Sequence, residues 1–293
     1  MEEFYSGIRE IVNDKVHGST QIAINLMRFL SRNLENVDLY KLREIFDEVL
    51  SIAETRTSII LPINMLHILR EAVESSISRD VRSNVKRLID SLLSYYSQDL
   101  EWSAENGAKA LEGYRRIFTL SYSSQVLKVL RKIKDIEVSI VAGWPLLDGL
   151  RASRELRSVG VKTFLYPDSS IYEAINSSDA IFLGCDAILI DGSIINRSGS
   201  RIATLISNYE SIPSYVIGES LKLDIRSIWK PEVWKYVFED VETEFQVFEK
   251  VEFELISKHI SELGIDTPRN FVNKALRKME EYTRKLLESV LSN

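Results

Sequence analysis

The sequence predicts an α/β protein, with a helical N-terminal domain followed by a Rossmann-like, doubly wound parallel-sheet C-terminal domain. From residue 1 to about residue 112, apolar residues recur at intervals of three and four, without strand-like alternation. From residue 117 onward, short apolar runs alternate with helical patterns. That alternation is typical of right-handed crossovers in a parallel sheet with both faces covered. The predicted domains are therefore residues 1–113 and 114–293.

The N-terminal half is predicted to consist of successive helices separated by short polar breaks. The last and longest of them covers residues 78–112, where apolar residues keep a period near 3.6. Capping or first-turn residues are present for the second, third and fourth helices: Ser19 or Thr20, Asn36 or Asp38, and Pro62.

The C-terminal half is predicted to alternate strands and helices. Short apolar runs predict strands at residues 117–120, 138–141, 161–166, 180–183, 187–190, 214–217 and 245–248. Helical spacing predicts helices at residues 123–134, 146–159, 171–175, 201–209 and 253–263, and a C-terminal helix that starts near Pro268. Residues 223–240 show no regular pattern.

Composition excludes several classes of function. The chain has 293 residues, of which 45% are hydrophobic and 27% charged, as in ordinary globular proteins. Its net charge of −6 argues against direct binding of nucleic acid, which requires a basic surface. No apolar run approaches the ~20 residues of a membrane span, and the acidic N-terminus is unlike a signal peptide. We therefore expect a cytoplasmic protein that contacts neither membrane nor nucleic acid.

Metal and nucleotide-cofactor chemistry is not indicated. Cys185 is the only cysteine, so neither a disulfide within the chain nor a cysteine metal cluster can form. His17, His67 and His259 are scattered without zinc-site spacing. No G-x-G-x-x-G follows a strand, and there is no P-loop motif. We expect no metal and no cofactor. His67 is predicted to lie on the apolar face of its helix, where a structural role is expected. His17 precedes Gly18 and is the histidine with the better case for a position near a site.

Residues 184–200, GCDAILIDGSIINRSGS, give the strongest candidate site. They follow a predicted buried strand, and ligands bind at the carboxyl ends of strands in parallel sheets. Asp186 comes directly after that strand, where partial desolvation suits a carboxylate to proton transfer. A Gly-rich turn can bring Asn196 and Arg197 back beside it to line a pocket for a small anion. Turn chemistry combined with an ion pair at the helix entry explains the same residues equally well.

Three further clusters are candidates for ligand binding. Ser121 and Ser123 follow the first predicted strand at a helix start, which suits a phosphate but also ordinary capping. Arg56 is a loop cation beside two hydroxyl residues, and a solvated arginine is the alternative. Glu219 and Lys222 follow another strand and would lie at the carboxyl edge of the sheet or form a surface ion pair.

Residues 184–203 resemble a known family. GCDAILIDGSIINRSGSRIA is similar to the GAD-x-x-x-x-NG-x-x-x-NK-x-GT stretch of the superfamily that contains the regulatory subunits of translation initiation factor 2B. The superfamily also contains isomerases of ribose 1,5-bisphosphate and methylthioribose 1-phosphate. Other segments resemble family motifs in family order: residues 16–23, 56–58, 145–149, 166–169 and 216–224. The resemblance implies a helical domain on a Rossmann-like domain, and a dimer.

The departures from the family pattern bear on activity. The isomerases have a cysteine in a "THCNS" segment, and Ser121 stands at that position with a far less acidic group. Asp186 matches their partner acid, and Asn196 matches a family asparagine. Arg197 replaces a lysine, whereas Trp144 replaces an arginine, and losing that cation weakens a bisphosphate site.

The sequence therefore predicts an initiation factor 2B-like regulatory subunit that senses a sugar phosphate or nucleotide. The alternative is an aldose–ketose isomerase of the ribose 1,5-bisphosphate type, in which Asp186 moves the proton and Ser121 stands at the cysteine position. Whether the protein is an enzyme stays open at this point. The resemblance implies a homodimer and an initiation factor 2 subunit as protein partner. The candidate ligand-binding residues are Gly18, Ser19, Arg56, Ser123, Asn196, Arg197, Glu219 and Lys222.

Overall fold

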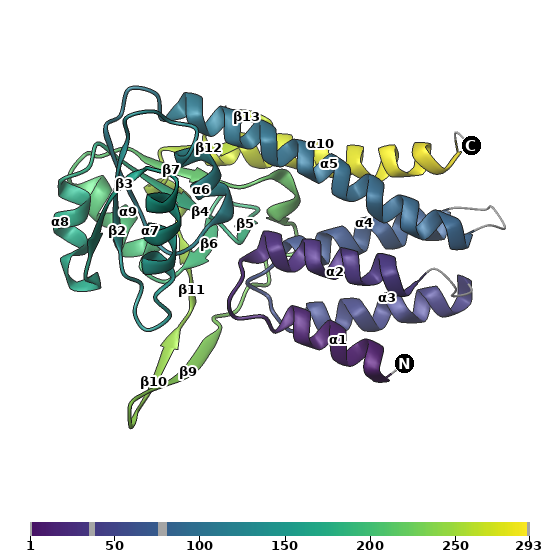
Figure 1. Cartoon of the computed structure of the whole chain (residues 1–293). Coiled ribbons are helices and arrows are strands. Elements are labelled where there is room, and N and C mark those ends of the chain that lie inside the picture. Colours follow the sequence, from purple (N-terminus) through teal and green to yellow (C-terminus); the bar gives the residue numbers. More distant parts are fainter. Residues whose placement is uncertain (1, 35–38, 76–80, 292–293) are drawn as a thin grey trace.

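The computed structural model describes residues 2–34, 39–75 and 81–291, and it confirms the predicted fold class. Figure 1 shows a group of helices on one side of the molecule and a sheet covered by helices on the other. The helical part consists of α1 (Glu2–Val12), α2 (Ser19–Asn33), α3 (Leu39–Ala53), α4 (Leu61–Ser75) and α5 (Val81–Ala110).

The ends of these helices test some of the predicted caps. Helix α2 begins at Ser19 with Gly18 at the N-cap position, and no side chain caps it. Pro62 is the second residue of α4, where its missing N–H leaves no helical hydrogen bond unmade. The predicted caps Asn36 and Asp38, and the predicted start of the fifth helix at Ser78, lie outside the described residues.

The main sheet has seven strands in the order β13-β12-β7-β4-β1-β2-β3. All neighbouring strands are parallel except β13, which is antiparallel to β12. Without β13, this is the strand order of a doubly wound Rossmann sheet. The strands are β1 (Arg116–Thr119), β2 (Glu137–Val141), β3 (Lys162–Tyr166), β4 (Ala180–Gly184), β7 (Ser214–Ile217), β12 (Lys258–Ser261) and β13 (Gly264–Asp266).

Helices cover both faces of this sheet, as its buried strands require. They are α6 (Ser124–Leu130), α7 (Asp148–Ser158), α8 (Ile171–Asn176) and α9 (Ser200–Tyr209). Helix α6 ends at Leu130, four residues earlier than the sequence pattern predicts. Apolar, mainly aliphatic side chains fill the core between the layers, and three aromatic residues, Phe118, Phe182 and Phe271, are fully buried in it.

A second, smaller sheet has the order β11-β6-β5-β8 and lies next to the first. Its strands are β5 (Ala187–Leu189), β6 (Ile194–Arg197), β8 (Leu223–Asp224) and β11 (Phe248–Val251). Strands β9 (Val233–Phe238) and β10 (Val241–Gln246) form a hairpin that extends away from the body of the molecule (Figure 1). Residues 223–240, for which the sequence shows no regular pattern, contain β8 and β9.

The predicted helix over residues 253–263 is wrong. That segment contains only a short 3₁₀ turn at Phe253–Leu255, followed by β12 between β7 and β13. Ile256, Ile260 and Leu263 recur at the spacing of a helix, which explains the prediction. The backbone pairing with β7 decides the outcome, because periodicity in a short apolar run does not separate buried strand from helix.

Helix α10 (Pro268–Leu291) returns along α5 and packs against α4 and α5 (Figure 1). Its residues Tyr282 and Leu286 are buried in the same core as the N-terminal helices. The end of the chain therefore completes the helical part, although it follows the sheet in sequence. In the described ranges, no helix is long and apolar enough to cross a membrane.

Candidate functional site

A cavity of about 210 Å³ lies at the carboxyl ends of β1 and β4. These two strands are adjacent at the point where the strand order of the sheet reverses, which is where doubly wound sheets bind ligands. Ser121 follows β1 by two residues and Asp186 follows β4 by two residues. The topology thus brings together two residues that are far apart in sequence.

Most of the predicted site residues line this cavity, and two do not. The two that do not line it are Arg56 and Glu219. The predicted residues that line it are Gly18, Ser19, Ser121, Ser123, Asp186, Asn196, Arg197 and Lys222.

The stretch from residue 184 to residue 200 folds as a hairpin. Strand β5 pairs with β6 across the turn that contains Asp191 and Gly192. The backbone N–H of Asp186 donates to the carbonyl of Ile195 at 2.8 Å, which brings Asn196 beside the carboxylate. Asn196 is buried, and its Nδ2 donates to Ser200 Oγ at 2.8 Å. The predicted fold-back of this stretch is confirmed.

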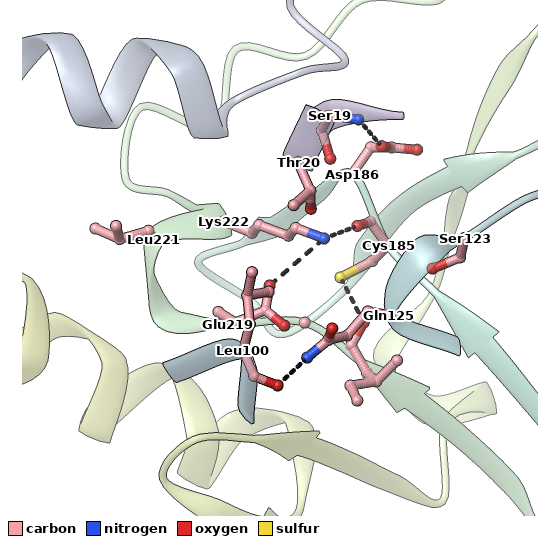
Figure 2. Close-up of polar contacts among 12 residues, drawn as sticks. Ser19, Thr20, Leu100, Ser123, Gln125, Cys185, Asp186, Glu219, Leu221 and Lys222 are labelled. Atoms are coloured by element: carbon pink, nitrogen blue, oxygen red, sulfur yellow. Dashed lines mark hydrogen bonds and ion pairs between the residues drawn. The ribbon is translucent and has the colours of Figure 1, made fainter. Parts of the chain in front are cut away.

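The N-terminus of α2 closes one side of the cavity. The backbone N–H of Ser19 donates to Asp186 Oδ1 at 3.3 Å (Figure 2). The first N–H groups of a helix have no partner within the helix and carry a partial positive charge, so they favour an anion. Here that anion is Asp186, and the helical half of the chain thereby contacts the sheet half at the cavity.

Ser121 and Ser123 approach from the loop after β1. Ser121 has a left-handed backbone, with φ of 58°, which is uncommon for a residue other than glycine and marks functional sites more often than average. Ser123 is the N-cap of α6, and its hydroxyl accepts from Val126 N at 3.4 Å, so it is a cap as well as a lining residue. A Cβ at Gly184 would lie 2.6 Å from Ser123 Oγ, which explains the glycine at the end of β4.

Lys222 forms the buried base of the cavity. Its Nζ donates to the carbonyl of Cys185 at 2.9 Å and lies 3.6 Å from Glu219 Oε2 (Figure 2). Burial opposes the charge on Lys222, but Glu219 and the other nearby acidic groups, Asp186 among them, together outweigh it and raise the pKa of the lysine. Glu219 is fully buried behind Lys222 and also accepts from the hydroxyl of Tyr96 at 3.1 Å. The two residues form a buried ion pair, not a surface pair.

Arg197 forms another part of the cavity wall. Its Nη2 lies 3.2 Å from Asp148 Oδ2, and its guanidinium packs on the rings of Phe248 and Trp234 at 4.9 and 5.3 Å. Burial raises the pKa of Asp148 despite the nearby arginine. Arg197 Nη1 is buried and has no hydrogen-bond partner among the described residues, so this cation keeps a donor for a ligand.

Arg56 is buried behind the cavity wall. Its Nη1 donates to the carbonyls of Val12 and Asp14, each at 2.9 Å, and its Nε lies 3.3 Å from Glu232. It is therefore neither solvated nor in the cavity lining, and it holds the loop between α1 and α2 in place.

Comparison with known proteins identifies the family. A model of the initiation factor 2 subunit family matches residues 15–275. The chain belongs to this family.

Relatives in the initiation factor 2 subunit family carry two kinds of name. A ribose 1,5-bisphosphate isomerase of Archaeoglobus fulgidus is 24% identical over 237 residues, covering 78% of this chain and 74% of that protein. A putative translation initiation factor eIF-2B subunit 2-like protein of Pyrococcus abyssi is 27% identical over 173 residues, covering 56% and 62%. The crystal structure of translation initiation factor eIF-2B from Pyrococcus horikoshii OT3 superposes with a TM-score of 0.84, at 21% identity, covering 93% and 99%, and shows the same fold.

In this member of the initiation factor 2 subunit family, several lining residues were not among the predicted ones. They include Tyr122, Asp148, Arg151 and Phe248. His17, which the sequence placed nearer a site than the other histidines, lines the cavity as well. Asp148 lies in the segment 145–149 that resembles a family motif, and Arg151 follows it one helical turn later. The motif could have suggested a ligand role for Asp148, whereas the position of Arg151 depends on contacts with residues far away in sequence.

The other two histidines lie away from the cavity. His67 is exposed on α4, so its predicted place on the apolar face of that helix is wrong. His259 is fully buried, its Nε2 lies 2.8 Å from the carbonyl of Gly218, and burial lowers its pKa to about 4. The described residues contain no group of three or more histidine, cysteine or acidic side chains placed to hold a metal ion.

The single thiol is not available for proton transfer. Cys185 is buried, its Sγ lies 3.5 Å from the carbonyl of Ile217, and burial raises its pKa to about 12. It therefore stays protonated at physiological pH. It cannot supply the acidic thiol that Ser121 lacks.

A second, more apolar cavity of about 240 Å³ adjoins the first. The two share Ser121, Asp148 and Arg197, so the Asp148–Arg197 ion pair is part of the wall of both. Trp144, at the position of a family arginine, is 54% exposed and lines this second cavity, not the first.

Proposed function

We propose that this chain is an initiation factor 2B-like regulatory subunit whose cavity binds a phosphorylated sugar or nucleotide as a sensor. The cavity combines cations, hydroxyls and the N-terminus of α2, and these are the groups that bind phosphate esters. Catalysis in this cavity is less favoured, because Ser121 stands at the position where the isomerases have a cysteine.

The observation that carries the proposal is that Ser121, at the position of the isomerases' cysteine, and Asp186 lie in one cavity. Both line the same cavity, so one half of an acid–base pair is present. The other half is a hydroxyl, which is a far weaker proton donor than a thiol. Because Cys185 is buried as a protonated thiol, it does not replace the missing group. This arrangement favours ligand binding over turnover.

An aldose–ketose isomerase is the second candidate. Asp186 lines the cavity, and its Oδ1 accepts from the backbone N–H of Ser19 at 3.3 Å. Within the described residues no hydrogen bond occupies its second oxygen, which is therefore available to a substrate. A relative at 24% identity is named a ribose 1,5-bisphosphate isomerase. In this reading Asp186 would move a proton between C1 and C2 of the sugar.

Calorimetry combined with a turnover assay separates the two candidates. The purified chain is titrated with ribose 1,5-bisphosphate, methylthioribose 1-phosphate and AMP, and each mixture is then analysed for isomerised sugar. We expect saturable heat with at least one ligand and no isomerisation above that of buffer. Robust isomerisation that disappears in Asp186→Asn would overturn the regulatory proposal in favour of the enzyme.

Ser121→Cys sharpens this test. If the cavity is otherwise competent for catalysis, the thiol should raise turnover strongly, because it restores the acidic group. We expect binding to persist and turnover to stay at the level of the unmodified chain. Asp186→Asn in the Ser121→Cys background is the control for any activity that does emerge.

We further propose that the chain forms a homodimer and contacts an initiation factor 2 subunit. The hairpin β9–β10 supports an association surface, since exposed apolar side chains gather on it: Val233, Tyr236, Val237, Phe238 and Val241. Sedimentation velocity on the purified chain should give the mass of a dimer, and a monomer at micromolar concentration would contradict this part.

A further inference from the structure

The cations around the first cavity differ in how much of their hydrogen-bonding capacity the protein itself uses. Lys222 is buried and is occupied by the carbonyl of Cys185 and by Glu219. Arg197 is paired with Asp148 at 3.2 Å and keeps its buried Nη1 for a ligand. Both charges are therefore largely balanced by neighbouring protein groups before any ligand arrives.

Arg151 on α7 is different. Its guanidinium lies over the ring of Tyr122 at 4.0 Å, and its Nη1 donates to the carbonyl of Val16 at 3.0 Å. Among the residues that the structure describes, Asp148 and Glu155 interact with its charge, but neither pairs with it directly: they pair with Arg197 and Arg131. A guanidinium has five N–H donors, so most of the donors of Arg151 remain available.

The surroundings hold Arg151 in position. The hydroxyl of Tyr122 donates to Glu155, which in turn pairs with Arg131, so the ring beneath the guanidinium is itself fixed. Val16 belongs to the loop that leads into α2, and the bond to its carbonyl lies on the exposed side of the cavity. Arg151 thus spans the rim between this loop and the loop after β1. Stacking on Tyr122 and the hydrogen bond to the carbonyl of Val16 orient the planar guanidinium of Arg151 and leave most of its N–H donors unused.

We propose that Arg151 is a specificity-determining residue that binds a second phosphate of the ligand at the rim of the cavity. This inference rests on the proposed function and narrows the ligand class to sugars with two phosphate groups. The inner cations Arg197 and Lys222 contact the remainder of the ligand. Arg151 also provides an arginine in a site where Trp144 stands at a family arginine position and lines the neighbouring cavity.

The experiment compares three ligands across matched variants. Calorimetry measures ribose 1,5-bisphosphate, ribose 1-phosphate and ribose 5-phosphate with the full chain and with Arg151→Gln. Arg154→Gln is the control, since Arg154 is an exposed arginine on the same helix and the charge change is identical. Arg151→Lys keeps the positive charge but removes the planar guanidinium and its paired N–H donors.

We expect Arg151→Gln to weaken the bisphosphate by about 10-fold or more, because a charge-assisted contact is lost. One of the two monophosphates should weaken with it and the other should stay within about 2-fold, which identifies the phosphate that Arg151 contacts. Arg151→Lys should recover part of the loss, and Arg154→Gln should change nothing. Circular dichroism checks that each variant is folded.

Two results would overturn the inference in distinguishable ways. If the full chain binds the ligands and Arg151→Gln weakens all three equally, or none, Arg151 serves the fold of the rim and the proposed function stands. If the full chain binds no phosphorylated sugar or nucleotide at millimolar concentration, the sensor proposal fails together with the role of Arg151.

Discussion

At the scale of single residues, a cluster of buried acids lies behind the cavity. Asp99, Glu219 and Glu262 interact electrostatically with one another, and Glu219 also balances the charge of Lys222 at the cavity base. Ionising Glu262 beside the other two acids is unfavourable, because like charges in a desolvated site oppose each other. Burial, with the nearby charge of Asp99, raises the pKa of Glu262 to about 8. The cluster therefore makes the stability of the protein depend on pH.

We predict that stability falls as the pH rises from about 4.5 to about 8, and that Glu262→Gln reduces this fall. Glu262 keeps its proton in the folded protein through this range, whereas the unfolded chain loses it above its ordinary pKa of 4.5. Unfolding therefore releases a proton in this pH range. As a result, the free energy of unfolding falls by about 1.4 kcal/mol for each pH unit. The amide that replaces the carboxyl in this variant still offers an oxygen to Ser220, whose N–H and hydroxyl donate to Glu262.

Thermal unfolding at pH 5.5 and pH 8 measures the effect. The control is Glu254→Gln, because Glu254 is an exposed acid on a neighbouring turn. A difference between the two pH values that is the same in Glu262→Gln and in the unmodified chain would show that Glu262 is not the titrating group.

At the scale of elements, the start of α7 is packed against the end of β2. A Cβ at Gly149 would lie 1.8 Å from the carbonyl oxygen of Val141, which leaves no room for any other residue. Asp148 and Arg151, which line the cavity, flank this glycine on the first turn of the helix. The close approach of α7 to the sheet thus sets the position of two lining residues.

We predict that Gly149→Ala destabilises the protein by at least about 1–3 kcal/mol, the usual cost of overpacking. The helix must move away from β2, so the affinity for a phosphorylated ligand should fall as well. Urea unfolding and calorimetry measure the two effects. Gly18→Ala is the stability control, because the nearest atom to its Cβ would be the carbonyl oxygen of Tyr122 at 4.0 Å. Equal stability of the two variants would contradict the argument.

The elements also show how far sequence reasoning reaches. The alternation of β4, a hairpin and α9 could be predicted because an apolar run, a Gly-rich turn and helical spacing are local signals. Strand β12 could not, since Ile256 and Ile260 fit a helix equally well and only pairing with β7 decides. The candidate site shows the same contrast. Asp186 could be predicted as a site residue from its place directly after a strand, which is a local signal, whereas Arg151 could not. Its position depends on Tyr122 and Val16, which lie far from it in sequence.

At the scale of the whole molecule, the helical part and the sheet part share one continuous core. Leu189, Ile195 and Leu221 from the sheet half are buried in the same cluster as the residues of α2 and α4. Asn64 on α4 donates to the carbonyls of Leu221 and Leu223, each at 2.8 Å, and is buried. Helices α5 and α10 run along both parts (Figure 1). The division at residues 113 and 114 stays a prediction, and this shared core argues that the two parts depend on each other.

We therefore predict that the chain unfolds in a single cooperative transition, with equal calorimetric and van't Hoff enthalpies. Leu286→Ala tests the coupling, because Leu286 on α10 is fully buried among the N-terminal helices. Its loss should cost about 2–5 kcal/mol and shift the whole transition, the sheet included, to lower temperature. Leu205→Ala is the control, since Leu205 is 44% exposed on α9. Differential scanning calorimetry that resolved two transitions, with only one of them shifted by Leu286→Ala, would instead establish residues 1–113 and 114–293 as independently folding units.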